Sequence, residues 1–483
     1  MTIQFGTDGW RAVIAETFTF ENLRLLAQGI ADTVAAPDWG GSAGNGGFDP
    51  KLMVVGFDTR FLSDRFATEV ARVLAANGIA VLLTHADAPT PAVSYAVRHH
   101  HAAGGVMITA SHNAPRYNGV KLKAAFGGSA LNDQCRRVEA FLSDNESRAR
   151  GPNLMDYDKA VGAGLIKRFN PMPAYYEHLR TLVNFDVIAA NPQRLVVDSM
   201  YGSGRGAIKG ILAGTGCEVF EIRGEMNPGF GGIHPEPIAK FLGAAAGALA
   251  AGNGAFAVVT DGDADRTGAL DGRGQFVDPH KIMALTLKYL VEKRGGTGAA
   301  VKTVSTTRMI NRLADKYGLA CYETPVGFNH IADYMLAQDV LIGGEESGGI
   351  SIKGHIPEGD GVLFGLLILE MVAAAGVPLE EMVAGLLREV GPAYYARKDL
   401  RLARPVSKKD MVRRLSESAP AAIGALKVAH VEALDGVKYI MDDDSWLLIR
   451  PSGTEPVLRV YAEARDEAAV AALLGYGQTV AAG

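Results

Sequence analysis

Residues 52–83 read LMVVGFDTRFLSDRFATEVARVLAANGIAVLL, and this stretch decides the fold class. The apolar run Leu52 to Val55 ends in a glycine and predicts a short buried strand. Ser63 is expected to cap a helix whose apolar residues recur every three or four positions, and Asn77-Gly78 is a stop signal. Ile79 to Leu83 is the next apolar run. Strand, amphipathic helix and strand in succession are typical of a parallel sheet covered by helices.

The same alternation extends in both directions from this stretch. Upstream, Thr19 is expected to cap a helix, and downstream a helix near Ala92 to His99 precedes a strand at Gly105 to Ala110. Further strands are expected at Leu195 to Val197, Cys217 to Ile222, Phe256 to Thr260, Lys302 to Ser305 and Val340 to Ile342. The sequence therefore predicts an α/β protein with helices on both faces of its sheets.

A chain of 483 residues is too long for one hydrophobic core, so several domains are expected. Past about Pro378 the pattern changes to longer, more charged helices and a strand at Trp446 to Ile449. We expect α/β domains at residues 1–155, 156–275 and 276–378, and an α+β domain at 379–483.

The composition argues against several classes of protein. The 48 Lys and Arg against 53 Asp and Glu give a net charge of −5, and no basic stretch suggests nucleic-acid binding. The three cysteines lie far apart, form no disulfide framework and suit a reducing cytoplasm. No signal peptide is recognisable, and Val362 to Val377 contains Glu370 and is too short for a membrane span. We expect a cytoplasmic monomer or homodimer that binds neither nucleic acid nor membrane.

Four predicted strands run directly into polar loops rich in glycine or hydroxyl residues. These loops are Thr109 to Asn113, Asp261 to Arg266, Gly343 to Gly349 and Arg450 to Pro456. Ligands of open α/β sheets bind beyond the carboxyl ends of the strands. One such loop from each of four successive segments predicts a single cleft lined by every domain.

Asp261, Asp263 and Asp265 place three carboxylates at alternate positions of one loop. They can converge on a hard divalent cation, and Mg²⁺ takes few carboxylates together with a phosphate oxygen. A calcium loop is excluded, since Arg266 stands where it needs glycine and Gly272 where it needs glutamate. A solvated acidic turn is the alternative, although such close carboxylates repel one another without a cation. Arg266 is expected to bind a phosphoryl oxygen of the substrate.

The same loop offers a second chemistry. Asp263 to Thr267 is similar to the aspartyl-phosphatase signature D-x-D-x-T, in which Asp263 would be the nucleophile of a hydrolase. The residues that follow, Gly268 to Val277, are typical of a hairpin that turns at Asp271-Gly272. A hydrolase therefore stays open as an alternative.

Ser111 follows an apolar strand and is flanked by His112 and Asn113, with Lys121 beyond a turn expected at Gly119. A serine hydroxyl needs a base or a cation before it can accept or donate a phosphoryl group. No G-x-S-x-G elbow surrounds Ser111, and His112 need not face it, so a Ser-His-Asp hydrolase is not supported. Taken alone, Ser-His-Asn is also an ordinary turn sequence.

Two nucleotide-binding patterns are disfavoured. Gly202 to Ala207 fits G-x-G-x-x-A, with Glu221 at the end of the next predicted strand. Asp198 to Tyr201 separate these glycines from their strand, whereas a dinucleotide fingerprint turns at once. The chain contains no Gly-Lys-Ser or Gly-Lys-Thr, so it has no P-loop.

The last two loops suit a phosphorylated sugar. Glu345 and Ser347 lie two residues apart on a glycine-lined turn and match neighbouring sugar hydroxyls, although an exposed loop with an incidental carboxylate has the same sequence. The C-terminal loop and the following strand combine guanidinium groups, hydroxyls and flexible backbone, which suit a phosphate dianion. The residues concerned are Arg450, Ser452, Gly453, Thr454 and Arg459.

Read in order, these loops resemble the α-D-phosphohexomutase family along nearly the whole chain. Phe5-Gly6-Thr7-Asp8-Gly9-Trp10-Arg11 is similar to its N-terminal signature, Thr109 to Asn113 to its phosphoserine loop and Asp261 to Arg266 to its metal loop. Gly344 to Gly348 is similar to its sugar loop and Arg450 to Pro456 to its phosphate loop. The resemblance implies three similar mixed α/β domains and a more mobile C-terminal domain around a central cleft.

The resemblance also implies roles for the site residues. Ser111 would be phosphorylated and would share Mg²⁺ with the three aspartates. Arg11, His112 and Lys121 would surround the reacting oxygens, with Lys121 or His112 as general acid or base. Glu345 and Ser347 would hold the sugar hydroxyls, and Arg450 to Thr454 the phosphate that does not react. The reaction would be an intramolecular phosphoryl transfer through a hexose bisphosphate, which needs charge neutralisation and alignment more than covalent machinery.

One residue departs from the family's pattern. In Thr324-Pro325-Val326-Gly327-Phe328-Asn329, where Gly327 is expected to contact the substrate, the family usually has Lys in place of Asn329. The neutral amide removes one phosphate-directed charge and leaves an inactive sugar-phosphate binder open as a further alternative. The sugar loop resembles glucose and mannose members, and the phosphate loop is shared with phosphoglucosamine mutases. We expect interconversion of glucose 1-phosphate and glucose 6-phosphate, then mannose phosphates, with phosphoglucosamine mutase as the alternative.

Overall fold

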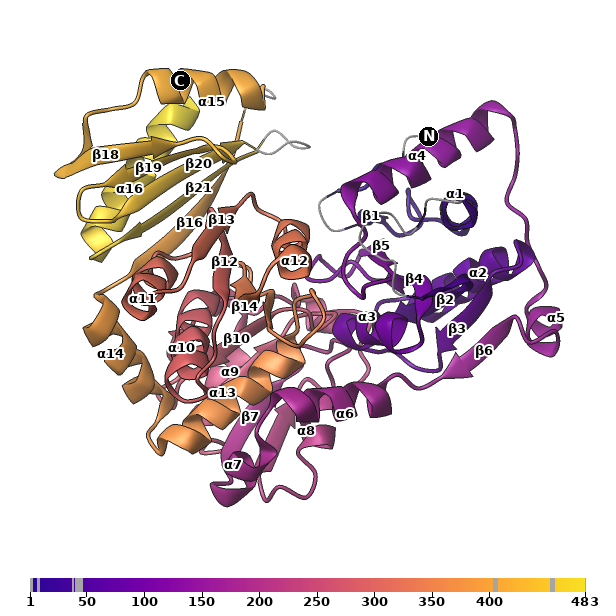
Figure 1. Ribbon diagram of the computed structural model, residues 1–483, viewed down its shortest axis with the longest axis horizontal. Helices are drawn as coiled ribbons and strands as arrows, with labels where there is room; N and C mark the ends of the chain where they lie inside the picture. The colour runs from indigo at the N-terminus through magenta and orange to yellow at the C-terminus, as the bar shows by residue number, and fades with distance from the viewer. Residues whose placement is uncertain are drawn as a thin grey trace.

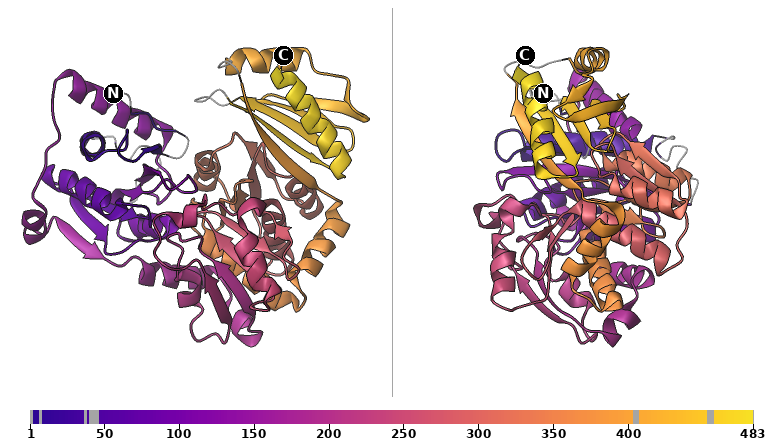
Figure 2. Two further views of the ribbon diagram at one scale, coloured as in Figure 1. Left: turned by 180° about the vertical axis from the view of Figure 1, so that it is seen from behind. Right: turned by 90° about the vertical axis from the view of Figure 1, so that its left-hand side faces the viewer.

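The computed structural model describes residues 3–6, 9–36, 39, 47–402, 407–451 and 457–482. Within these residues the strands form four sheets that follow one another along the chain. Figure 1 shows the N-terminal and C-terminal units on opposite sides of the molecule, joined below by the second and third units, and Figure 2 shows the same arrangement from behind and from one side. The predicted α/β class is confirmed.

The first sheet is mixed, with the strand order β1-β5-β4-β2-β3-β6. Strands β2, β3 and β4 run parallel, as the sequence predicted, and β6 adds a parallel strand that was not predicted, whereas β5 runs antiparallel between β4 and β1. Its elements are β1 (Trp10–Val13), α1 (Phe20–Ala35), β2 (Asp49–Phe57), α2 (Ser63–Ala76), β3 (Ala80–Thr84), α3 (Thr90–His99), β4 (Ala102–Ile108), β5 (Tyr117–Ala124), α4 (Asn132–Ser147), α5 (Tyr157–Gly162) and β6 (Ile166–Phe169).

Two local predictions in this unit are wrong. Gly119 lies inside β5, opposite Arg11 of β1, and not in a turn, because both neighbouring strands pair with this segment. Ser63 does not cap α2: Leu62 is the capping residue, and the Ser63 hydroxyl donates a hydrogen bond to Asp58 Oδ1 at 2.9 Å. The cap predicted at Thr19 is confirmed, since its side chain accepts a hydrogen bond from the Asn22 backbone.

The second sheet has the order β11-β10-β9-β7-β8, and β10 and β11 form the predicted hairpin. Its elements are α6 (Met172–Leu182), α7 (Phe185–Ala190), β7 (Arg194–Asp198), α8 (Ala207–Ile211), β8 (Glu218–Ile222), the short 3-10 helices Phe230–Gly232 and Ala239–Phe241, α9 (Gly243–Ala250), β9 (Ala257–Thr260), β10 (Thr267–Leu270) and β11 (Phe276–Val277).

The third sheet has the order β13-β12-β14-β15 and shares one hydrophobic core with the second. Its elements are α10 (Pro279–Glu292), β12 (Ala299–Thr303), α11 (Met309–Tyr317), β13 (Cys321–Thr324), α12 (Phe328–Ala337), β14 (Val340–Gly344), β15 (Ile350–Ile352), α13 (Gly361–Ala375) and α14 (Leu379–Val390). The predicted buried helix is confirmed as α13. In the described part of the chain no single helix is long and apolar enough to cross a membrane, and α13 with α14 passes that test only as a pair bent by 86°.

The fourth unit is a sheet of antiparallel neighbours with the order β16-β21-β20-β19-β18-β17, and its helices cover it in Figure 1. The strand predicted at Trp446 to Ile449 is confirmed as β20, whereas the sequence did not reveal the other strands. The elements are β16 (Tyr394–Arg401), α15 (Lys408–Glu417), β17 (Ala422–Ile423), β18 (Leu426–Glu432), β19 (Val437–Met441), β20 (Trp446–Pro451), β21 (Val457–Ala464) and α16 (Glu467–Ala482).

Candidate active site

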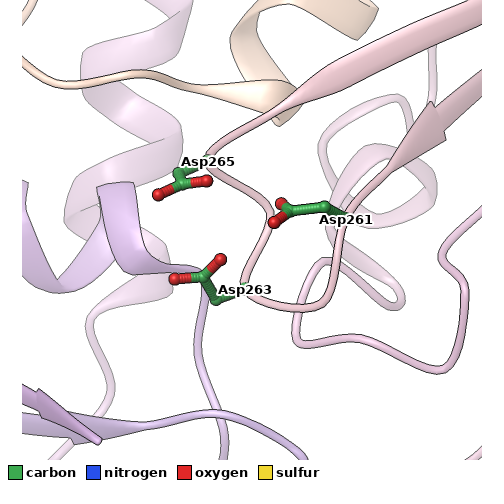
Figure 3. A group of neighbouring side chains, drawn as sticks. All are labelled: Asp261, Asp263 and Asp265. Atoms are coloured by element: carbon green, nitrogen blue, oxygen red, sulfur yellow. The ribbon is translucent and has the colours of Figure 1, made fainter. Parts of the chain in front are cut away.

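Three buried carboxylates lie on the loop between β9 and β10. Figure 3 shows Asp261, Asp263 and Asp265 turned toward one another, and one oxygen of each lies within 4.8 Å of the others. Burial and then the charges of Asp263 and Asp265 raise the pKa of Asp261 well above its ordinary value. Such a cluster is stable only where cations or protons neutralise it.

Ser111 faces these carboxylates from the loop that follows β4 in the first sheet. Its hydroxyl donates a hydrogen bond to Asp261 Oδ2 at 2.8 Å, and the residue is fully buried. His112 Nδ1 lies 3.2 Å from the same hydroxyl, so the histidine does contact the serine. Loops separated by 150 positions therefore meet at one point, as expected for the carboxyl ends of strands in neighbouring sheets.

Lys121 supplies the nearest positive charge to the aspartates. Its Nζ lies 3.0 Å from Asp263 Oδ2 and 2.5 Å from Asp265 Oδ2. Thr90, the first residue of α3, donates a hydrogen bond to Asp263 Oδ2 at 2.6 Å. Burial alone would raise the pKa of Asp263, but Lys121 and the Thr90 hydrogen bond outweigh it and hold that pKa below its ordinary value.

The donor set fits a hard divalent cation. Carboxylate and hydroxyl oxygens are the ligands that Mg²⁺ prefers, and here four such side chains converge: those of Ser111, Asp261, Asp263 and Asp265. Asp263 Oδ1 is buried and has no hydrogen-bond partner among the described residues, which leaves a desolvated oxygen directed into the cluster.

Two arginines and a neutral histidine flank the serine. Arg11 Nη1 donates to Asn113 Oδ1 at 2.7 Å, and Arg266 Nε lies 4.0 Å from Asp265 Oδ1. Burial, followed by the charges of Arg266 and Arg11, holds the pKa of His112 well below its ordinary value. The imidazole is therefore neutral at pH 7, and the same surroundings make it a weak base.

The predicted sugar loop lies beside the metal loop. The Gly327 backbone donates to Glu345 Oε1 at 2.9 Å, and the Ser347 hydroxyl lies 3.4 Å from Glu345 Oε2. The Thr267 backbone N–H donates to the Gly348 carbonyl at 3.1 Å, which connects this loop to the strand that leaves the metal loop. Glu345, Ser347 and Gly327, predicted as substrate contacts, are thus brought together.

The C-terminal unit adds Arg450 to this arrangement. Arg450 Nε donates to Asp435 Oδ2 at 2.7 Å, and the same oxygen accepts the Val326 N–H at 3.1 Å. Arg459 lies opposite Arg450 on the neighbouring strand, with its Nε 3.9 Å from Asp399 Oδ2. Ser452, Gly453 and Thr454, like Thr7 and Asp8 of the N-terminal signature, lie outside the described residues.

Asn329, where the resemblance leads one to expect lysine, lies in the first turn of α12 and is buried. Its Oδ1 has no hydrogen-bond partner within the described ranges. The side chain therefore leaves an acceptor, in place of a positive charge, beside Gly327.

The glycine-rich segment after β7 does not form a phosphate-binding turn. The Ser203 backbone donates to the Gly262 carbonyl at 3.0 Å, and a Cβ on Gly202 would lie 2.6 Å from the Asp261 carbonyl oxygen. These glycines allow the segment to pack against the metal loop. The nicotinamide interpretation therefore loses its one supporting motif.

Several residues of the site were missed from the sequence. Thr90 contacts Asp263, Asp435 links Arg450 to the third unit, and Asp58 and Arg60 lie behind the serine loop. A signal for the last two existed, because Asp58-Thr59-Arg60 directly follows β2 as a further polar loop at a strand end.

A serine hydroxyl, clustered carboxylates and flanking cations at the carboxyl ends of α/β sheets define an enzyme of phosphoryl transfer. Comparison with known proteins gives the family. The chain matches the models of phosphoglucomutase/phosphomannomutase α/β/α domain I at residues 2–149, domain II at 173–274, domain III at 278–390 and the C-terminal domain at 407–475. It belongs to the phosphoglucomutase/phosphomannomutase family of α-D-phosphohexomutases, which are Mg²⁺-dependent intramolecular phosphotransferases.

Relatives are similar along their whole length. A phosphoglucomutase/phosphomannomutase of Thermococcus kodakarensis is 30% identical, covering 96% of this chain and 95% of its own. A phosphoglucosamine mutase of Frankia alni is 33% identical, covering 97% and 95%. A crystal structure of a phosphomannomutase-like protein of Thermus thermophilus superposes with a TM-score of 0.85 at 36% identity over 100% of both chains. The relatives are therefore named after different sugar phosphates.

Proposed function

We propose that this protein interconverts glucose 1-phosphate and glucose 6-phosphate, and more slowly the mannose phosphates, through phosphorylated Ser111 and a hexose bisphosphate. The observation that carries the proposal is the 2.8 Å contact between the Ser111 hydroxyl and Asp261 at the edge of the carboxylate cluster. A serine at this point can share one cation with all three aspartates.

Asp261, Asp263, Asp265 and an oxygen on Ser111 would hold Mg²⁺, which would neutralise charge on the phosphoryl oxygens. The first transfer breaks the bond between phosphorus and Ser111 Oγ and forms a bond between phosphorus and a sugar hydroxyl oxygen. His112 is neutral and accepts the hydroxyl proton, while the Lys121 ammonium is placed to donate one, so either serves as general acid or base. After the bisphosphate turns over, the second transfer returns a phosphoryl group from its other end to Ser111.

The remaining residues act on the parts of the sugar phosphate that do not react. Arg11 and Arg266 stabilise the transferring group, and Glu345 and Ser347 accept and donate hydrogen bonds to sugar hydroxyls. Gly327, Arg450, Arg459 and the loop of Ser452, Gly453 and Thr454 bind the second phosphate. Glucose is preferred on the similarity of the sugar loop, and relatives named phosphoglucomutase support it. Glucosamine phosphate is the second candidate, supported by the Frankia alni relative.

The hydrolase alternative is weakened by the contacts of Asp263. One of its two carboxylate oxygens, Oδ2, already binds Lys121 and Thr90, which leaves only Oδ1 to attack phosphorus.

The test begins with the protein incubated with glucose 1,6-bisphosphate and Mg²⁺, followed by peptide mass spectrometry. Phosphate is expected on Ser111, and Ser111→Ala is expected to abolish turnover while retaining sugar-phosphate binding. Ser445→Ala is a matched control, because Ser445 is a buried serine that donates to a carboxylate, Asp443, at 2.9 Å far from the site.

Coupled assays with glucose, mannose and glucosamine 1-phosphates then identify the sugar. Release of free phosphate with label on Asp263 would establish the hydrolase in place of the mutase. Binding of substrate without turnover, even after priming with bisphosphate, would show that the chain is an inactive binder.

A further inference from the structure

Arg60 lies directly after β2, beneath the loop that carries Ser111. Its side chain is fully buried and forms an ion pair with the equally buried Asp58, with Nε 3.2 Å from Oδ2. A buried guanidinium is costly unless its charge and its donors are all engaged. The two terminal nitrogens of Arg60 supply these contacts, and their partners lie on the serine loop.

Both terminal nitrogens of Arg60 donate to the backbone of the serine loop. Nη2 donates to the Ser111 and Asn113 carbonyls, each at 2.6 Å, and Nη1 donates to the Ala114 and Tyr117 carbonyls at 2.9 and 3.0 Å. Four carbonyls along residues 111–117 thus converge on one planar group. A lysine ammonium could not reproduce this fork, since it has no fixed plane of donors.

Ser111 needs such support because its backbone is unusual. Its φ of 49° lies in the left-handed region, which residues other than glycine rarely adopt and which persists only where the surroundings hold it. Its N–H is held by the Thr109 hydroxyl at 2.8 Å and its carbonyl by Arg60. This geometry directs the hydroxyl toward Asp261.

The same carbonyl is where the metal loop meets the serine loop. A Cβ built on Gly262 would lie 2.4 Å from the Ser111 carbonyl oxygen, so the two backbones are in direct contact there. Phe230, also from the second unit, places its ring 4.9 Å from the guanidinium carbon of Arg60. Arg60 therefore touches both the serine loop and the unit that supplies the aspartates.

We propose that Arg60 is a positioning residue of phosphoryl transfer, holding the Ser111 carbonyl so that the serine oxygen stays aligned with the aspartate cluster. This inference rests on the proposed function, in which Ser111 carries the phosphoryl group. Arg60 does not contact the reacting atoms or the side chains predicted to bind Mg²⁺. It acts through the backbone carbonyls of the serine loop.

The test uses the full-length Arg60→Lys variant, which keeps the charge and loses the fork. A displacement of the serine oxygen by about 1 Å is expected to lower kcat by about 10²-fold. KM is expected to stay within about threefold, because the groups that bind the sugar are untouched. Phosphorylation of the dephosphorylated enzyme by glucose 1,6-bisphosphate is expected to slow in parallel, and the ³¹P resonance of phosphoserine is expected to shift.

Arg294→Lys is the matched control. Arg294 also combines a buried carboxylate (Glu370), a backbone carbonyl (Leu182) and an aromatic ring (Tyr289), but it lies away from the site. It is expected to lower the unfolding temperature without changing kcat or the ³¹P resonance.

The outcomes separate this inference from the proposed function. If wild-type protein gains no phosphate on Ser111, the proposed function fails whatever Arg60 does. If wild-type protein turns over and Arg60→Lys matches it in kcat, the positioning role is overturned. If Arg60→Lys does not fold, Phe230→Leu decides: a fall in kcat at unchanged KM supports the role, and wild-type kinetics overturn it.

Discussion

Glu323 on β13 is the residue whose replacement tests how the fourth unit is held on the third. Its Oε2 accepts from Lys302 at 2.6 Å within the third unit, and its Oε1 accepts from Lys438 of the fourth at 2.7 Å. Both lysines are almost completely inaccessible to water. Glu323→Gln keeps the shape and removes the charge, which leaves two ammonium groups buried together.

The magnitude follows from the proton affinities. Lys302 and Lys438 overcome the burial penalty and lower the pKa of Glu323 from 4.5 to about 2. Since each factor of ten in proton affinity corresponds to about 1.4 kcal/mol, the carboxylate contributes about 3 kcal/mol at neutral pH. Burial, and then Lys302, lower the pKa of Lys438 to about 8, so this lysine can lose its proton at pH 7 for about 1.4 kcal/mol. We expect Glu323→Gln to lower the free energy of unfolding by about 3 kcal/mol. The part of this cost that comes from Lys438 is limited to about 1.4 kcal/mol, because this lysine can lose its proton.

The loss also has a defined pH dependence. The folded pKa of Glu323 is depressed, so its contribution is complete above 4.5 and disappears as the pH falls from 4.5 toward 2. Above pH 8 the folded Lys438 is increasingly neutral, and the attraction to Glu323 weakens from that side. The difference between wild type and variant is therefore greatest between about pH 5 and 8.

Urea unfolding followed by tryptophan fluorescence measures this difference. Trp446 is fully buried at the same contact, with the Lys438 ammonium 4.8 Å from its ring, and so reports local opening. Glu389→Gln is the matched control: Glu389 also bridges two lysines, Lys288 and Lys316, but at the surface, where such pairs contribute little. Equal unfolding midpoints for Glu323→Gln and wild type across pH 5–8 would refute the reasoning.

Two further predictions concern the metal loop. Mg²⁺ binding is expected to release a proton and to strengthen as pH rises, because the pKa of Asp261 is raised when no metal is bound. Calorimetry in buffers of different ionisation enthalpy measures the released proton. Binding heats that are the same in all buffers would contradict the prediction. Gly262→Ala is expected to abolish Ser111 phosphorylation and weaken Mg²⁺ binding, since its Cβ would meet the Ser111 carbonyl oxygen at 2.4 Å. Gly247→Ala, whose Cβ meets no atom within 4 Å, is its control, and equal phosphorylation of both variants would contradict the prediction.

The meeting of Ser111 with the aspartates was predictable because its signal is local. Each side chain follows a strand of apolar residues, and the carboxyl ends of strands share one edge of a sheet. The same logic identified Glu345 and Arg450. What the sequence could not give was the contact of His112 with Ser111, since adjacent residues on an irregular loop have no fixed relation.

Strand β5 was missed because its buried positions are partly charged. Lys121 and Lys123 alternate on this strand and are both buried, the first against Asp263 and Asp265 and the second against Glu358. A pattern search expects apolar residues at such positions. The charge partners come from other units, so only the tertiary structure explains why lysines stand there.

Two strands of the fourth unit, β16 and β18, were missed for a different reason. β16 and β18 are mostly solvent-accessible along their length, and β16, YYARKDLR, is rich in charged residues, so neither strand has the apolar alternation that a pattern search needs. Arg60 illustrates a third limit. Its position after a strand was visible, but its partners are backbone carbonyls, which no side-chain pattern encodes.

The loops of the four units are connected in series through backbone and side-chain contacts. Ser111 touches Gly262, the strand leaving that loop binds Gly348, and Glu345 accepts the N–H of Gly327. Asp435 then joins the neighbouring Val326 N–H to Arg450. Because one carboxylate oxygen contacts both, we expect a movement of the fourth unit to displace Arg450, the proposed phosphate ligand, together with the loop at Gly327. We therefore expect the fourth unit to influence the proposed sugar contacts as well as the proposed phosphate contact, although it supplies only the second.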